Sequence, residues 1–326
     1  MSTQKMSKDA QAILIMCCGL GVGGGVVPLK PAEWRRVAQI LVARGMRPGD
    51  LLDLDAEGVK AGLGYGDAMA ERMVRLMGRS ASLFFEIAEL EKIGIRLVTR
   101  ADEEYSPQLR RKLGDNCPPY FFYAGDLRLL KERCVGFVGS RNLMVEDIDF
   151  EGLLVERAVK AGYVIVSGGA QGADRIAEEV GLKCGGRVVE FLPGKMLEKM
   201  RSSQVVRAIQ DGKMLLLSYL APSAGFSVGG AMGRNKFIYA QSEETVVVKS
   251  EGKGGTWAGA VECLENGYAV VRCWNNEKYP ENLELIRMGA RPIDENWVVG
   301  AGDDGMIPGD DVAAGERVEL KQMMLL

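Results

Sequence analysis

The sequence predicts an α/β protein in which a Rossmann-like, doubly wound and mainly parallel sheet follows a small all-helical domain. Three observations predict this fold class. Residues 1–93 show helical periodicity only, short β-branched runs alternate with amphipathic segments from Cys134 onward, and the composition of the 326 residues is that of an ordinary globular protein. Apolar strands separated by amphipathic helices are typical of a parallel sheet covered on both faces.

The segment 1–93 is expected to form a helical domain of the SAM or helix-hairpin-helix type. Pro31 suits the first turn of a helix, and apolar residues follow it at helical spacing. A long apolar stripe that begins at Met69 predicts one helix over 67–92. The helices expected in this domain cover 8–18, a segment from Pro31, 55–62 and 67–92.

The segment 94–275 is expected to form the sheet domain, with 94–133 as its lead-in. Past Asn275 the alternation fades, and a run rich in Gly and Asp predicts that 276–326 is an appendage, loose in part. The expected strands cover 134–139, 163–167, 187–192, 214–218, 244–249 and 268–273, and the expected helices cover 146–161, 173–184, 197–211, 228–241 and 256–266.

Charge and side-chain types limit the chemistry that the chain can perform. The formal net charge is −3, which does not favour a nucleic-acid binder, although a local basic pocket can lie on an acidic molecule. The absence of histidine excludes Ser-His-Asp and Cys-His catalysis. Seven cysteines without a C-x-x-C pair, and without any histidine, predict reduced thiols rather than a zinc site. We therefore expect no metal and no cofactor.

An uncharged stretch at 10–29 has the hydropathy of a signal peptide or a membrane span. Its five glycines and Pro28 suit neither, so we expect a buried helix that runs into a loop, in a cytoplasmic protein that does not bind membranes. The stretch also contains G-x-G-x-x-G at 19–24. A dinucleotide site needs a helix that opens on the last glycine, whereas Pro28 and Pro31 follow here, which favours a plain loop.

Four segments at strand ends or on one helix have the composition of a phosphate-binding site. Parallel strands meet ligands at their carboxyl ends, where glycines admit a phosphate to the backbone and a helix start binds anions. Each segment alone also fits a turn, a helix cap or a solvated helix face, but four at one sheet edge indicate a phosphate-rich ligand. Thr256 is in addition expected to cap a helix. The candidate residues are Gly139, Ser140, Arg141, Ser167, Gly168, Gly169, Gln171, Gly172, Asp174, Arg234, Asn235, Lys236, Lys253, Gly254, Gly255 and Thr256.

In order and spacing, these motifs resemble the DprA/Smf family of DNA-processing proteins, over about residues 30–275. The resemblance implies a non-enzymatic protein that binds single-stranded DNA in a basic pocket at the strand ends, often as a homodimer, and passes the strand to a RecA-type recombinase. The matching motifs are Gly139-Ser-Arg141, Ser167-Gly-Gly-Ala-x-Gly-x-Asp174, Arg234-Asn-Lys236, Lys253-Gly-Gly-Thr256, Gly94-Ile-Arg-Leu-Val-Thr-Arg100-Ala-Asp102…Tyr105-Ser-Pro107 and Pro118-Pro119…Gly125-Asp-Leu127.

Roles for individual residues follow from this resemblance, and Lys253 is added to them on its chemistry alone. Arg141, Arg234 and Lys236 would hold backbone phosphates. Hydrogen bonds would come from Ser140, Gly168, Gly169, Gly172 and Asn235.

The chain also departs from the family pattern. Gln171 stands where members commonly have Arg, Ala173 replaces a bulky aliphatic residue, and no histidine follows Asp174. The segment 226–233 replaces one that contains proline, and the acidic tail shows no winged-helix module. We infer a divergent subfamily, for which DNA binding is expected but recombinase loading is not assumed.

Two other functions compete with DNA binding. A sensor or hydrolase of a small nucleotide could use the same loops, but Glu262 lies more than a helical turn past Thr256, which disfavours hydrolysis and leaves sensing open. A scaffold with a vestigial pocket is the third hypothesis, and the retained cations speak against it. Three aromatic residues could stack on bases or belong to the core: Phe237, Tyr239 and Trp257.

Overall fold

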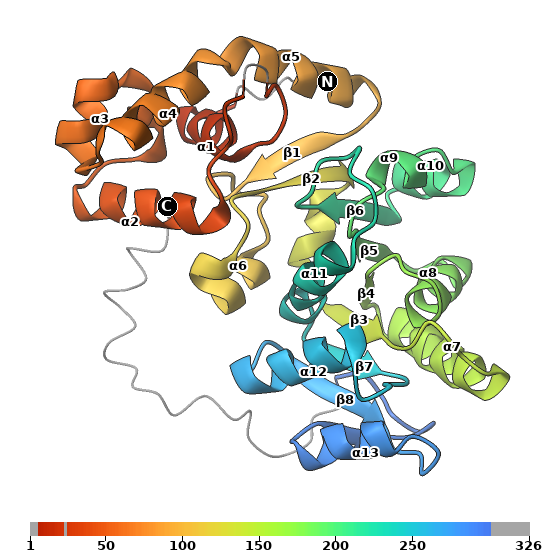
Figure 1. Cartoon of the computed structure of the whole chain (residues 1–326). Coiled ribbons are helices and arrows are strands. Elements are labelled where there is room, and N and C mark those ends of the chain that lie inside the picture. The colour runs from red at the N-terminus through yellow and green to blue at the C-terminus, as the bar shows by residue number, and fades with distance from the viewer. Residues whose placement is uncertain (1–5, 23–24, 301–326) are drawn as a thin grey trace. The chain divides into compact units, whose positions relative to one another are not determined.

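The computed structural model describes residues 6–22 and 25–300, which fall into two compact units (Figure 1). Among the described residues, the first unit contains 6–22, 25–105 and 114–123, and the second contains 106–113 and 124–300. Within this part of the chain, no helix combines the length and the apolar composition needed to cross a bilayer.

The first unit is helical, with one short antiparallel pair of strands. Ser7 caps the first helix by accepting a hydrogen bond from the backbone N–H of Ala10, and Asp55 caps α3 in the same way through Gly58. The helices are α1 Lys8–Cys17, α2 Pro31–Ala43, α3 Ala56–Leu63, α4 Asp67–Gly78 and α5 Ser80–Lys92, with 3₁₀ turns η1 Pro48–Asp53 and η2 Gly114–Asn116. The strands are β1 Arg96–Thr99 and β2 Tyr120–Gly125, with Arg96 opposite Tyr123.

The expectation of a single helix over 67–92 is wrong, because the chain breaks between α4 and α5 at Arg79. The Arg79 side chain is buried and donates hydrogen bonds to the carbonyl groups of Ile15 at 2.6 Å, Cys18 at 2.7 Å and Leu20. These carbonyls lie at and beyond the end of α1, where backbone acceptors lack intrahelical partners. The break therefore serves a tertiary contact that helical periodicity does not reveal.

The second unit contains seven strands in the order β6-β5-β4-β3-β7-β8-β9, and every neighbouring pair that the register defines is parallel. This arrangement confirms the predicted fold class. The strands are β3 Cys134–Val138, β4 Val164–Ser167, β5 Val188–Phe191, β6 Met214–Ser218, β7 Glu244–Val247, β8 Val270–Trp274 and β9 Arg291–Ile293. The helices are α6 Pro107–Leu113, α7 Val145–Lys160, α8 Ala173–Lys183, α9 Met196–Lys199, α10 Ser203–Gln210, α11 Val228–Gln241, α12 Gly254–Asn266 and α13 Pro280–Arg287, with the 3₁₀ turn η3 Leu127–Lys131.

The direction of winding reverses between β3 and β7. From β3 the chain proceeds through β4 and β5 to β6, and it then crosses back through α11 to β7 on the other side of β3. Helices α7 and α8 pack together on one face of the sheet, and α11 and α12 pack together on the other (Figure 1). In sheets of this kind the loops that leave the two central strands diverge, and a crevice opens at their carboxyl ends.

Regular structure continues past Asn275, where the sequence pattern fades. Helix α13 leads to β9, which pairs with β8 so that Arg272 lies opposite Arg291. Strand β9 is a short edge strand that contains Pro292, and proline is tolerated there because an edge position needs one ladder hydrogen bond fewer. Trp274 stacks on Phe150 of α7, with ring centroids 4.0 Å apart. The appendage expected from residue 276 stays a prediction, and 301–326 lie outside the described residues.

Candidate nucleic-acid interface

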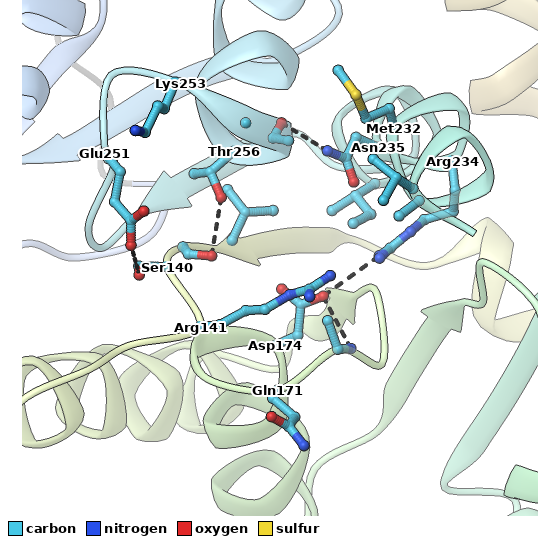
Figure 2. A pocket seen from close by; sticks show the side chains of 18 of the residues that line it. Ser140, Arg141, Gln171, Asp174, Met232, Arg234, Asn235, Glu251, Lys253 and Thr256 are labelled. Carbon is cyan, nitrogen blue, oxygen red and sulfur yellow. Dashed lines mark hydrogen bonds and ion pairs between the residues drawn. The ribbon is translucent and has the colours of Figure 1, made fainter. Parts of the chain in front are cut away.

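A cavity of about 330 Å³ opens at the carboxyl ends of β3 and β7, at the point where the winding reverses (Figure 2). Loops after β3, β4 and β7 form its walls together with helix α11 and the first turn of α12. Of the residues singled out from the sequence, the cavity brings together Gly139, Ser140, Arg141, Gln171, Asp174, Arg234, Asn235, Lys253, Gly254, Gly255 and Thr256.

The other candidates lie outside this lining, although all of them belong to the described part of the chain. Ser167 is fully buried, and its hydroxyl donates to the carbonyl of Asp174 at 3.0 Å. Lys236 is half-buried, with its ammonium group 5.5 Å from the ring centroid of Phe237. The phosphate contact expected of Lys236 stays a prediction. The remaining candidates outside the lining are Gly168, Gly169 and Gly172.

Gly172 allows the loops after β3 and β4 to lie against each other. Its φ is +76°, and a Cβ at this position would overlap the carbonyl oxygen of Ser140. The backbone N–H of Ala173 donates to that same carbonyl at 3.2 Å. Glycine is therefore required here by the contact between two loops, rather than by the approach of a ligand.

Arg234 forms the inner wall of the cavity. Its side chain is 4% exposed, and a Cβ on Gly168 would overlap its guanidinium group. Nη1 lies 3.5 Å from Oδ2 of Asp174, which is an ion-pair distance but is too long for a strong hydrogen bond (Figure 2). Among the described residues, neither Nε nor Nη1 of Arg234 has a hydrogen-bond acceptor. Buried donors of this kind are costly unless a ligand accepts from them.

Asp174 holds this wall in place. Oδ2 accepts a hydrogen bond from the backbone N–H of Ala170 at 3.3 Å, in addition to the ion pair with Arg234. Burial raises the pKa of Asp174, and the positive charge of Arg234 opposes that shift. The carboxylate is thus engaged with the protein, and the cations of the lining that can meet an incoming anion are Arg141, Arg234 and Lys253.

The mouth of the cavity combines a cation with an aromatic ring. Arg141 is exposed, and its guanidinium carbon lies 5.3 Å from the ring centroid of Phe226, which is itself 43% exposed. Of the aromatics that the sequence left open between base stacking and the core, Phe237 and Tyr239 belong to the core, and Trp257 is half-buried. Sequence reasoning missed Phe226, although an aromatic residue between Gly225 and Ser227, in a loop that follows a strand, was a usable signal.

The start of α12 faces the cavity without a side-chain cap. The helix begins at Gly254, so the expectation that Thr256 caps it is wrong. Lys253 is the N-cap residue, and within the described chain no side chain accepts from the first turn. The free N–H groups at the start of this 13-residue helix favour an anion.

Asn235 and Thr256 connect the walls of the cavity. The amide of Asn235 donates to the carbonyl of Gly255 at 2.7 Å, and the hydroxyl of Thr256 donates to the carbonyl of Gly139 at 3.0 Å (Figure 2). Both side chains use these donors within the protein. These bonds position the loops, and direct contact of Asn235 and Thr256 with a ligand stays a prediction.

Glu251 is an acidic member of the lining that sequence reasoning did not single out. Its carboxylate accepts a hydrogen bond from the hydroxyl of Ser140 at 2.5 Å. Three cations, Arg141, Arg234 and Lys253, therefore face two carboxylates in the lining, those of Asp174 and Glu251. The lining therefore carries more positive than negative side chains, although the formal net charge of the whole chain is −3.

Two further carboxyl groups close to the site are fully buried on the second unit. Burial raises the pKa of Glu190 to about 8, with Lys199 opposing the shift. Burial also raises the pKa of Glu151, and the nearby charges of Asp174 and Asp147 raise it further. Burial therefore disfavours the charged form of both carboxyl groups.

Comparison with known proteins places this geometry in a family. Residues 96–298 match the family model described as DNA recombination-mediator protein A. The chain belongs to this family. The match covers the whole parallel sheet and all the loops that line the cavity, and it confirms the resemblance to DprA/Smf proteins.

Individual members of the family support the assignment. The chain is 28% identical over 212 residues to the DNA processing protein DprA of Bacillus subtilis, an alignment that covers 64% of this chain and 71% of the relative. It is 25% identical over 275 residues to the protein Smf of Synechocystis, covering 80% of this chain and 68% of the relative. The solved structure of DNA processing protein A from Streptococcus pneumoniae has the same fold, with a TM-score of 0.62, 20% identity, and coverage of 89% and 95% of the two chains.

Proposed function

We propose that this protein binds single-stranded DNA without catalysing a reaction, and that it holds backbone phosphates in the cavity between β3 and β7. One observation carries the proposal. Arg141, the unsatisfied donors of buried Arg234 and the uncapped start of α12 converge on a single cavity. Membership of a family described as recombination mediators, and a relative named as a DNA processing protein, agree with a phosphate-rich ligand of this kind.

The mouth of the cavity favours a single strand over a duplex. An unpaired base can lie on the exposed ring of Phe226 while its phosphate meets Arg141, because the two side chains are in contact. Bases inside a duplex are stacked on one another and cannot reach such a ring. A cavity of about 330 Å³ also suits one nucleotide rather than the width of a double helix.

We further propose that the bound strand is passed to a RecA-type recombinase, and that the protein acts as a cytoplasmic homodimer. The family description of a recombination mediator supports the first of these proposals. The resemblance of the site motifs to DprA/Smf proteins supports the second. Pull-down with a purified recombinase and sedimentation analysis of the free chain would test them separately.

A sensor of a free nucleotide is the second candidate function, because the cavity has the volume of one nucleotide. The geometry disfavours hydrolysis. The two lining carboxylates are already engaged, Asp174 with Arg234 and Glu251 with Ser140. A general base must instead reach the water or hydroxyl that it activates.

Fluorescence-anisotropy titration with labelled oligo-dT is the direct test of the proposed function. We expect single strands to bind more tightly than duplexes of the same length, and the logarithm of affinity to fall with the logarithm of salt concentration by about 0.7 per phosphate contact. Free dTMP should compete weakly. The proposal fails if no DNA binds at low salt, and tight binding of dTMP with no gain for oligonucleotides would favour the nucleotide sensor.

Substitution Phe226→Ala is expected to weaken single-strand binding by about 5- to 150-fold, since one stacked base contributes about 1–3 kcal/mol. The slope of affinity against salt should not change, because no charge is removed, and Phe226→Trp should preserve binding. The matched control is Phe85→Ala, which removes a ring that is 66% exposed on the helical unit. Equal effects of the two alanine variants would show that Phe226 does not contact bases.

A further inference from the structure

A second cavity, of about 710 Å³, lies on the same unit between α8 and α10. It adjoins the first cavity, because Ala170 and Gln171 line both. We call it the α8–α10 groove. Its lining consists of Gly169, Ala170, Gln171, Arg175, Glu178, Glu179, Leu182, Lys183, Lys199, Ser202, Gln204, Val205, Arg207, Ala208, Asp211 and Lys213.

The groove has a surplus of free cations. Arg175 pairs with Glu179 at 2.6 Å, and Lys199 pairs with Glu178 at 2.7 Å, so these charges largely offset one another. The other cations of the lining are exposed and make no ion pair within the described residues: Lys183, Arg207 and Lys213. Asp211 is the remaining acid. The groove therefore offers positive charge to an anion from solvent.

The floor of the groove is apolar. Val205 and Ala208 on α10 are buried, and Leu182 on α8 is half-buried. A surface with cations at its rim and apolar side chains at its floor matches a polymer of phosphates and bases. A small anion would use the rim alone, whereas a single strand can place its phosphates on the rim and its bases on the floor.

The length of the groove fits several nucleotides. Residues Arg175, Leu182 and Lys183 lie on one face of α8, so the groove follows that helix from its first turn to its last. The 11 residues of α8 span roughly 16 Å. Stacked nucleotides advance about 3.4 Å each along one strand, so about five of them cover this distance.

We propose that a DNA strand leaving the first cavity past Gln171 continues along the α8–α10 groove, where Lys183, Arg207 and Lys213 contact its phosphates. This inference rests on the proposed function and extends it. The first cavity alone holds short oligonucleotides, and the groove adds affinity only for strands long enough to reach it.

The test compares wild-type protein with the triple variant Lys183→Ala/Arg207→Ala/Lys213→Ala, using labelled dT3 and dT20 in anisotropy titrations. All three side chains are exposed, so the variant should fold, and circular dichroism checks this. The affinity for dT3 should stay within about twofold of wild type. The affinity for dT20 should fall at least about tenfold. The slope of its log affinity against log salt concentration should become shallower by about 2, because three phosphate contacts of about 0.7 each are lost.

The matched control is Lys92→Ala/Lys160→Ala/Arg287→Ala, which removes three cations whose side chains are 67%, 71% and 67% exposed outside the groove. It should leave both affinities unchanged. The groove proposal is overturned if dT3 and dT20 lose affinity equally, if dT20 binds the variant as tightly as wild type, or if the control triple weakens dT20 to the same degree. Binding of neither probe by wild type would instead refute the proposed function, and the groove proposal with it.

Discussion

Replacing Arg141 by alanine is expected to weaken the binding of single-stranded oligo-dT by one to two orders of magnitude. A hydrogen bond to a charged group contributes about 1.5–3 kcal/mol, and the substitution also removes the cation that lies over Phe226. The slope of log affinity against log salt concentration should become shallower by about 0.7, because one phosphate contact is lost. Arg141 is exposed, so the variant should retain the stability of wild type. Anisotropy titration at several salt concentrations measures both effects.

The matched control for this variant is Lys160→Ala. Lys160 is 71% exposed on the last turn of α7, pairs with Glu156, and lies at the opposite end of the strands from the cavity. Arg141→Lys should give an intermediate affinity, because lysine keeps the charge but loses the two-pronged geometry. An affinity loss in Lys160→Ala as large as in Arg141→Ala would show that general charge, rather than the cavity, governs binding.

Gly168→Ala is expected to destabilise the protein by about 1–3 kcal/mol and to reduce DNA binding together with stability. The new Cβ would occupy the position of the Arg234 guanidinium. Arg234 is buried and packed beside Asp174, so it cannot swing into solvent to make room. Urea denaturation gives the change in the free energy of unfolding, and anisotropy gives the change in affinity.

A double-mutant cycle separates this clash from other effects. In an Arg234→Ala background, the guanidinium is gone and Gly168→Ala should cost little further stability, so the coupling energy should approach the full effect of the single variant. The control is Gly229→Ala, because a Cβ on Gly229 would meet no atom within 4 Å. Additive effects of Gly168→Ala and Arg234→Ala would contradict the packing described here.

The alternation of strands and helices in the second unit was predictable because its strands are buried on both faces and therefore appear as apolar runs. Strand β6 and helix α11 begin and end at the predicted residues, 214–218 and 228–241. The break at Arg79 was not predictable. It depends on carbonyl groups more than fifty residues away in sequence, and helical periodicity carries no information about such partners.

The site was predictable in its composition but not in the roles of its residues. Glycine, serine and arginine after buried strands indicate a cavity at the sheet edge, and most of the candidates meet there. Two contacts could not be predicted, because they depend on how helices approach the loops. Arg234 packs against Gly168, and Asn235 donates a hydrogen bond to Gly255. Phe226 could have been singled out from its place in a loop between Gly225 and Ser227, but its exposure and its contact with Arg141 depend on tertiary structure.

The hydrogen bonds between the walls of the cavity have a kinetic consequence. Asn235 ties α11 to the start of α12, Thr256 ties α12 to the loop after β3, and Lys249 holds that loop through the carbonyl of Asn142 at 2.9 Å. The binding surface is thus organised before a ligand arrives, and little conformational entropy is lost when a strand docks. Encounter should then be limited mainly by diffusion and charge. Differences in affinity among DNA strands should appear in how long each complex lasts, rather than in how fast it forms.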